Sequence, residues 1–92
     1  MITAIVLVQT VADRIPETAQ TIADLDGVAE VYSCAGDVDL IAVVKVHQHE
    51  DLADVIAGGL SKVDGVVSTD THIAFRSYSR ADTDGGFAIG TG

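Results

Sequence analysis

The stretch CAGDVDL (residues 34–40) lies near the midpoint of the 92-residue chain, between two apolar runs of strand character. These runs are VAEVYS (residues 28–33) and LIAVVKV (residues 40–46). Gly36 can adopt a positive φ without steric cost, and the side chains of Asp37 and Asp39 can accept hydrogen bonds from nearby backbone N–H groups. The stretch therefore predicts the tight connection of a central β-hairpin.

The chemistry of this loop allows two interpretations. In the first, Gly36 and Asp37 only close the hairpin. In the second, the exposed backbone amides and the carboxylates of Asp37 and Asp39 contact a small polar ligand.

Strand and helix signals surround the hairpin in a regular order. The predicted strands, each rich in β-branched residues, cover residues 2–9, 28–35, 39–46 and 66–78. Pro16 is favoured in the first turn of the first helix, and Glu50 and Asp51 place negative charge where the second helix begins. Each helix is expected to end at an Asp-Gly pair, with glycine in the left-handed conformation, at Asp26-Gly27 and at Asp64-Gly65.

An internal repeat with an offset of 38 residues supports this order, since LDGV (residues 25–28) aligns with VDGV (residues 63–66). The chain is predicted to fold as βαββαβ, a ferredoxin-like α+β sandwich in which two helices cover one face of a four-stranded antiparallel sheet. This domain is expected to span residues 1–79. Residues 80–92 are glycine-rich and lack periodicity, which predicts a flexible C-terminal tail.

Both faces of the predicted sheet are apolar. On the first strand, Ala4, Val6 and Val8 lie on one face, whereas Ile5 and Leu7 lie on the other. Two helices can cover only one face, so the second face would expose an apolar patch large enough to need a partner. The pattern predicts a homodimer in which the sheets of two subunits face each other.

The composition argues against several classes of function. A net charge of −9, with five dispersed basic residues, disfavours direct nucleic-acid binding, which needs a basic surface to neutralise phosphates. The single cysteine excludes an internal disulfide and favours a cytoplasmic protein. The N-terminus lacks a signal-peptide pattern and no apolar run approaches about 18 residues, so no membrane association is expected.

Metal-binding and catalytic motifs are weak. His47 and His49 precede Glu50 and Asp51, but their spacing matches no strong zinc signature, and polar residues are expected in a strand-to-helix loop. Cys34 has no neighbouring base in the sequence, and the serines carry no nucleophile motif. The sequence therefore predicts a non-enzymatic protein without a metal site or a cofactor.

A second polar cluster, STDT (residues 68–71), interrupts the predicted fourth strand. Strand alternation places Thr69 and Thr71 on one face, together with Val67 and Ile73. In one interpretation, the two threonines are ordinary solvent-exposed strand residues. In the other, their hydroxyls act with the hairpin loop to bind the ammonium and carboxylate groups of an amino-acid-like ligand.

The order and spacing of these motifs resemble the effector domain of Lrp/AsnC-type regulators, the RAM (regulation of amino-acid metabolism) domain, over about residues 2–78. The motifs, in chain order, are LDGV (25–28), GDVDL (36–40), DGV (64–66) and TDT (69–71). Val38 stands where the family pattern usually has an aromatic residue. The helix-turn-helix that precedes this domain in the family's transcription factors is absent, so the chain resembles a stand-alone RAM protein.

The resemblance implies a domain that dimerises through its sheets, assembles into larger rings, commonly octamers, and binds an amino acid between dimers. The ligand contacts that it implies come from the hairpin loop and the fourth strand: Gly36, Asp37, Val38, Asp39, Thr69 and Thr71. Such a protein would sense an amino acid or modulate full-length Lrp/AsnC regulators, and would not bind DNA itself.

Three alternatives remain open at this point. The ACT domain shares βαββαβ, and Asp13-Arg14-Ile15-Pro16 resembles its first loop, although the usual glycine is missing. A small dimeric α+β-barrel enzyme would need a polar pocket between helices and sheet, whereas the helix stripes here are apolar. A ligand-free dimerisation scaffold would use the same apolar sheet face.

Overall fold

The computed structural model describes residues 1–80, so nearly all of the predicted tail, from residue 81 onward, lies outside the described residues. Two short 3-10 turns, η1 (Ala12–Arg14) and η2 (Leu60–Lys62), accompany the main elements. In chain order these are β1 (Ile2–Thr10), α1 (Ile15–Ala23), β2 (Val28–Ser33), β3 (Leu40–Val46), α2 (Asp51–Ile56) and β4 (Val66–Ile73). Within the described part of the chain, no helix is long and apolar enough to cross a membrane.

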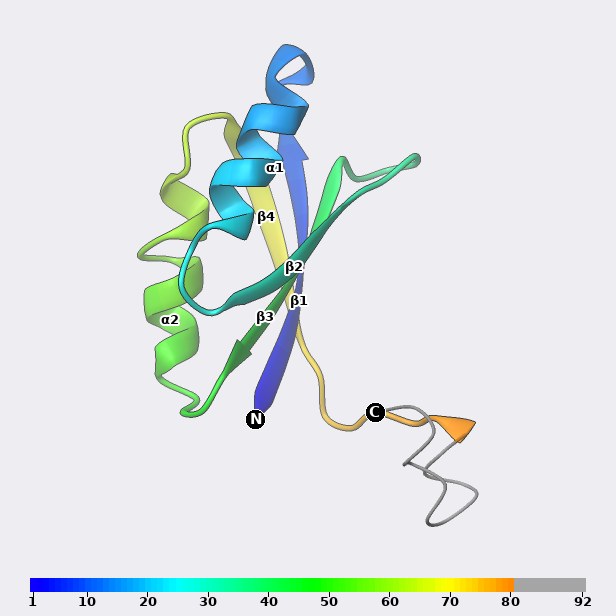
Figure 1. The fold of residues 1–92 in the computed structure, drawn as a ribbon, viewed down its shortest axis with the longest axis vertical. Coiled ribbons are helices and arrows are strands. Elements are labelled where there is room, and N and C mark those ends of the chain that lie inside the picture. Colours follow the sequence, from blue (N-terminus) through cyan, green and yellow to red (C-terminus); the bar gives the residue numbers. More distant parts are fainter. Residues whose placement is uncertain (81–92) are drawn as a thin grey trace.

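The four strands form one antiparallel sheet in the order β2-β3-β1-β4, and both helices lie on the same face of it (Figure 1). Val6 in the middle of β1 lies opposite Ala42 of β3 and Thr71 of β4. The predicted ferredoxin-like βαββαβ sandwich is thus confirmed, with β1 and β3 at its centre and β2 and β4 at its edges.

The core lies between the sheet and the helices, and strand alternation selects its members. Every second residue of β1 and β3 faces the helices and is buried, namely Ala4, Val6, Val8, Leu40, Ala42, Val44 and Val46. Ile22 of α1 and Leu60 of η2 close the layer from the helix side and are fully buried. Burial of such a side chain contributes about 1.5–3 kcal/mol, so this single layer supplies most of the driving force for folding.

The glycines of the two Asp-Gly pairs have the left-handed conformation that the sequence predicted for them. Gly27 after α1 has φ +91° and Gly65 after η2 has φ +99°, both in the left-handed region that favours glycine. Pro16 lies in the first turn of α1, where its missing N–H costs no hydrogen bond.

The second helical segment is shorter than predicted. A continuous helix was expected up to Asp64-Gly65, but α2 ends at Ile56 and the chain re-forms only a 3-10 turn at η2. Gly58 and Gly59 separate the two pieces, and each glycine costs about 1 kcal/mol relative to alanine inside a helix. The break still allows Leu52 and Leu60 to be buried, so the predicted apolar stripe is retained.

The fourth strand also differs from the prediction, which extended it to Tyr78 and placed Val67 on the face of Thr69. It ends at Ile73, because its register pairs Ile73 with Ala4 and β1 begins only two residues earlier, at Ile2. A register shift near its start pairs Val66 with Thr10 and leaves Val67 exposed. Val66 therefore packs against the core in place of Val67.

Candidate binding site

The hairpin loop joins β2 to β3 as a tight connection. The Cys34 N–H donates to the Asp39 carbonyl at 2.9 Å, which closes the loop. Gly36 has φ +140°, and no atom lies within 4 Å of the position that a Cβ would occupy. The loop therefore needs glycine at position 36 for its backbone conformation. The space beside Gly36 is not filled by any other residue that the structure describes.

Asp39 fastens this loop to the end of β1. Its Oδ2 accepts a hydrogen bond from the Thr10 backbone N–H at 2.9 Å and lies 3.5 Å from the Thr10 hydroxyl. The Asp39 N–H in turn donates to the Val8 carbonyl at 3.1 Å. A charged acceptor makes such bonds stronger than neutral ones, so Asp39 has a structural role. The sequence predicted that its side chain could accept from a nearby backbone N–H, whereas the donor, Thr10, lies 29 positions away in the chain.

Asp37 and Val38 occupy the tip of the same loop. The Gln9 side-chain amide donates to the Asp37 carbonyl, which ties the tip to β1 through the backbone and leaves the exposed carboxylate outside this contact. Val38 is half-buried. Of the two predicted carboxylates, only that of Asp37 projects from the loop without a hydrogen bond to β1.

Thr69 and Thr71 lie on the other side of β1 from the hairpin loop. They pair with Val8 and Val6, which places both threonines on the helix-covered face, as expected for residues two apart. The Thr69 hydroxyl lies 3.5 Å from the hydroxyl of Ser61 in η2. The structure thus brings the loop residues together and the threonines together, but β1 separates the two groups.

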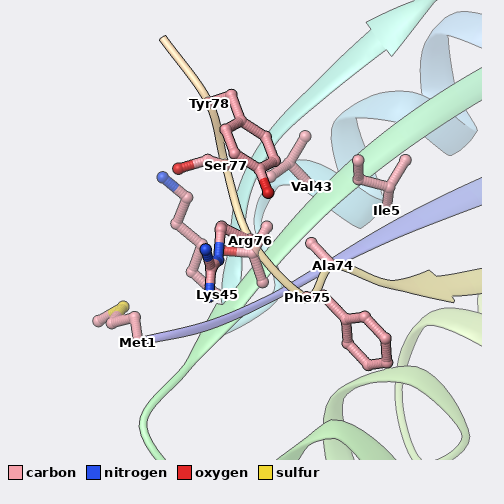
Figure 2. Close-up of a pocket in the computed structure, with 10 residues that line it drawn as sticks. Met1, Ile5, Val43, Lys45, Ala74, Phe75, Arg76, Ser77 and Tyr78 are labelled. Atoms are coloured by element: carbon pink, nitrogen blue, oxygen red, sulfur yellow. The ribbon is translucent and has the colours of Figure 1, made fainter. Parts of the chain in front are cut away.

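Neither of two cavities in the described part of the chain is lined by the six predicted ligand residues. A smaller cavity of about 330 Å³ lies between the end of α1 and α2. A larger one of about 580 Å³ lies on the other face of the sheet, beside the segment after β4 (Figure 2). Its residues are Met1, Thr3, Ile5, Val43, Lys45, Ala74, Phe75, Arg76, Ser77 and Tyr78.

The sheet face opposite the helices, here called the open face, has an apolar centre and a charged rim. The register places Ile5, Leu7, Ile41, Val43 and Tyr32 on this face. Its polar and charged residues include Glu30, Lys45, Asp70 and His72. Within residues 1–80 both helices lie on the opposite face of the sheet, so the two-sided apolar pattern expected from the sequence is confirmed.

Other side chains singled out in the sequence do not form a reactive cluster. His72 Nε2 lies 3.3 Å from Asp70 Oδ2 on β4, and both side chains are exposed. Cys34 is a free, half-buried thiol whose Sγ lies 3.7 Å from the Tyr32 carbonyl. His47 and His49 are exposed, and no three His, Cys, Asp or Glu residues among residues 1–80 are placed to hold a metal ion.

Sequence reasoning missed the larger cavity and the bond between Asp39 and Thr10. The cavity depends on where β4 ends, which follows from strand register. The Asp39 bond joins residues 29 positions apart and has no local sequence signal.

Comparison with known proteins gives a consistent result. Residues 3–83 match the family described as the Lrp/AsnC ligand binding domain. The helix-turn-helix transcriptional regulator LrpA of Pyrococcus horikoshii is 36% identical over 59 residues, which cover 64% of this chain and 42% of that protein. A second, uncharacterised helix-turn-helix regulator of the same organism is 35% identical over 72 residues, which cover 78% of this chain and 48% of that protein.

The chain thus spans about half the length of the curated relatives it matches. Among solved structures, the protein TTHA0845 from Thermus thermophilus has a TM-score of 0.81 and 44% sequence identity. That match covers 87% of this chain and 100% of the solved one.

Proposed function

Because the chain belongs to the family of Lrp/AsnC ligand-binding (RAM) domains, we propose that it is a non-enzymatic regulatory module that binds an amino acid. It assembles with copies of itself and senses the amino acid or modulates full-length Lrp/AsnC regulators. The observation that carries this proposal is the geometry of the hairpin loop. Hydrogen bonds to Gln9 and Thr10 of β1 hold residues 36–39 in place, and the Asp37 side chain is exposed. No atom lies within 4 Å of the position that a Cβ of Gly36 would occupy, so there is space for a ligand beside this loop.

The chemistry of an α-amino acid suits this loop and β4. A carboxylate such as that of Asp37 can accept hydrogen bonds from the ligand's ammonium group. Backbone amides near Gly36 and the hydroxyls of Thr69 and Thr71 can donate to its carboxylate. Asp39 Oδ2 already holds Thr10, so its contribution to a ligand would come from Oδ1.

The separation of the two residue groups by β1 supports a site shared between chains. In one chain, the hairpin loop lies on the β3 side of β1 and the threonines lie on its β4 side. A ligand that contacts both groups would then bind where the loop of one copy meets β4 of another. The proposed assembly uses the open face for dimers and this contact to join dimers into a ring, such as an octamer.

The proposal assigns no DNA binding to this domain itself. Its net charge of −9 opposes close approach to phosphates, and its five basic residues are dispersed. Any effect on transcription would pass through regulators that carry the same type of domain next to a helix-turn-helix.

A thermal-shift screen against the twenty amino acids at millimolar concentration tests the proposal. A ligand at about 100 times its Kd stabilises the folded state by about 2.7 kcal/mol, which shifts Tm by several degrees. We expect a selective shift with one amino acid or a small group of related ones. Asp37→Asn should abolish that shift without changing the Tm of the unliganded protein, because its side chain is exposed.

Asp54→Asn is the matched control, since it removes one exposed carboxylate from α2 and should keep the ligand-induced shift. A flat screen in the native protein would contradict amino-acid binding and favour a ligand-free dimerisation scaffold. A shift that survives in Asp37→Asn would remove the hairpin loop from the site.

A further inference from the structure

The larger cavity, beside the segment after β4, has a local charge opposite to that of the chain as a whole. The chain carries 14 acidic and five basic residues, which give its net charge of −9. Lys45 of β3 and Arg76 of the segment after β4 both line the cavity, and none of its ten lining residues is an aspartate or a glutamate. Positive charge that gathers at a cavity without a counter-charge favours the binding of an anion.

The two cations are not used to hold the fold together. Within residues 1–80, neither Lys45 nor Arg76 forms a side-chain hydrogen bond or ion pair. This holds although Glu30 lies opposite Val43 in the register of β2 and β3. In Figure 2 the nitrogen atoms of both cations lie on the same side of the cavity as Ser77. Both charges are thus available to one bound anion, which lysine contacts as a point charge and arginine through its planar set of N–H groups.

The rest of the cavity lining is apolar, with a few hydroxyl groups. Ile5 and Val43 are paired in the register of β1 and β3, and they line the cavity together with Tyr78. Thr3 and Ser77 contribute hydroxyls. The cavity volume of about 580 Å³ falls within the range of about 300–1,000 Å³ that is usual for small-molecule sites. The lining therefore suits a molecule with an anionic end and an apolar body.

We propose that this cavity binds an organic anion that carries an aromatic ring and no ammonium group. The anionic oxygens of this ligand contact Lys45 and Arg76. Its ring packs on Ile5 and Val43, beside Tyr78, where two aromatic rings can stack with an offset or meet edge to face. The anionic group is a carboxylate or a phosphate ester, since both present oxygen acceptors to the same two cations.

The charge of the lining also determines which molecules are rejected. An amino acid would bring its ammonium group next to two cations, and none of the lining residues offers a carboxylate to receive it. Like charges brought together at a binding site are strongly unfavourable. The same molecule without the ammonium group avoids this repulsion, so the cavity favours aromatic acids over the corresponding amino acids.

This site is separate from the amino-acid site proposed at the hairpin loop. Thr3 and Ile5 lie in the first half of β1, whereas the loop is bonded to Gln9 and Thr10 at the other end of that strand. The cavity residues all belong to one chain, so the site is complete without a second copy. One domain would then respond to two kinds of molecule, a zwitterion at one end of the sheet and an anion at the other.

Isothermal titration calorimetry with a matched pair of ligands tests the proposal, on the protein in the oligomeric state in which it is isolated. 3-Phenylpropanoate and L-phenylalanine differ only by the ammonium group, so the ratio of their Kd values measures the discrimination. Both are titrated into the Asp37→Asn variant as well as the native protein, which removes any contribution from the hairpin loop. We expect 3-phenylpropanoate to bind at least about tenfold more tightly than L-phenylalanine.

Charge-removing variants locate the site. Lys45→Met and Arg76→Met should each raise the Kd of 3-phenylpropanoate at least about tenfold, because each removes a charged hydrogen-bond donor. Lys62→Met is the matched control, since it removes the same charge from η2, outside the cavity, and should leave the Kd unchanged. These three side chains are exposed, so the circular dichroism of the fold should be retained in every variant.

A second ligand distinguishes the two anionic groups. Adenosine 5′-monophosphate presents a phosphate ester and an aromatic base. If it binds instead of 3-phenylpropanoate, with the same dependence on Lys45 and Arg76, the anion is a phosphate ester and the site stands. Inorganic phosphate that binds as tightly as the nucleotide would overturn the role of the apolar lining.

Three results would overturn the proposal itself. The first is no binding of either 3-phenylpropanoate or the nucleotide at millimolar concentration. The second is a Kd that rises equally in Lys62→Met, which would show that only the net charge of the chain matters. The third is an equal affinity for L-phenylalanine and 3-phenylpropanoate in Asp37→Asn. None of these results bears on the amino-acid site at the hairpin loop.

Discussion

Gly65 lies where a side chain would collide with Thr18 of α1. Gly65 has φ +99°, and a Cβ placed there would overlap the Thr18 hydroxyl oxygen. Thr18 is 1% exposed, and within residues 1–80 its hydroxyl has no hydrogen-bond partner. Glycine is therefore required for two reasons at this position: the backbone conformation and the space taken by α1.

The contrast between Gly65→Ala and Gly36→Ala separates these two reasons. Left-handed backbone costs a non-glycine residue about 1–2 kcal/mol, and an overpacked contact adds about 1–3 kcal/mol. Gly65→Ala should therefore lower the free energy of unfolding by about 2–5 kcal/mol, measured by urea denaturation. Gly36→Ala, where no atom lies within 4 Å, should lose only the backbone part. If both variants lose the same free energy of unfolding, Thr18 can move away from a Cβ at position 65 without destabilising the fold.

Elements differ in how firmly they are attached to the sheet. α1 is a nine-residue helix with Thr18 and Ile22 buried. The second helical segment is six residues of α2, two glycines and a short turn, and its fully buried side chain is Leu60. Short helices have little stability of their own, so this segment depends on its few buried contacts.

Leu60→Ala tests that dependence. Deleting a fully buried leucine side chain costs about 2–5 kcal/mol, through lost transfer free energy and the cavity left behind. We expect a loss in that range in urea denaturation, accompanied by faster amide hydrogen exchange in residues 51–62. Ser61→Ala, one residue further on at an exposed position, should change stability by less than about 0.5 kcal/mol. A similar effect of both substitutions would mean that this segment is not anchored by Leu60.

The sequence predicts the interiors of elements better than their ends. Alternation over β1 and β3 identifies the buried face, because a strand has only two sides and the core selects one. Gly27 and Gly65 are recognisable because their conformation is almost exclusive to glycine. The predicted end of β4 was wrong because it is determined by where β1 begins, which is information about a distant partner.

The candidate site was likewise predicted where local sequence determines the structure, and missed where residues far apart in the chain meet. The loop residues follow from local turn chemistry, and the positive φ of Gly36 is confirmed. The bond from Thr10 to Asp39 spans two elements and could not be predicted from either of them. The placement of Thr69 and Thr71 across β1 from the loop follows from the strand order, in which β1 lies between β3 and β4. The predicted topology implied this order, but the prediction of one site from both groups did not take it into account.

At the scale of the whole molecule, the asymmetry of the sheet is the dominant feature. One face carries the helices and a buried apolar layer, and the other carries Ile5, Leu7, Ile41 and Val43, over which no helix or strand of residues 1–80 lies. A chain of 92 residues has a thin core, so burial of a second apolar face would add substantially to its stability. The dimer and the ligand site that needs more than one chain are, in this proposal, consequences of the same uncovered face.

Ile41→Glu tests the role of the open face, because Ile41 lies on that face and outside the larger cavity. A carboxylate buried without a partner between two sheets is strongly unfavourable, whereas in a separate chain it would face water. We expect the dimer Kd to rise at least about tenfold, equivalent to about 1.4 kcal/mol, with the far-UV circular dichroism of the fold retained. Ala53→Glu on the exposed side of α2 is the control and should leave the Kd unchanged. A dimer of undiminished affinity in Ile41→Glu would show that the chains associate through another surface, and the open face would then need a different partner.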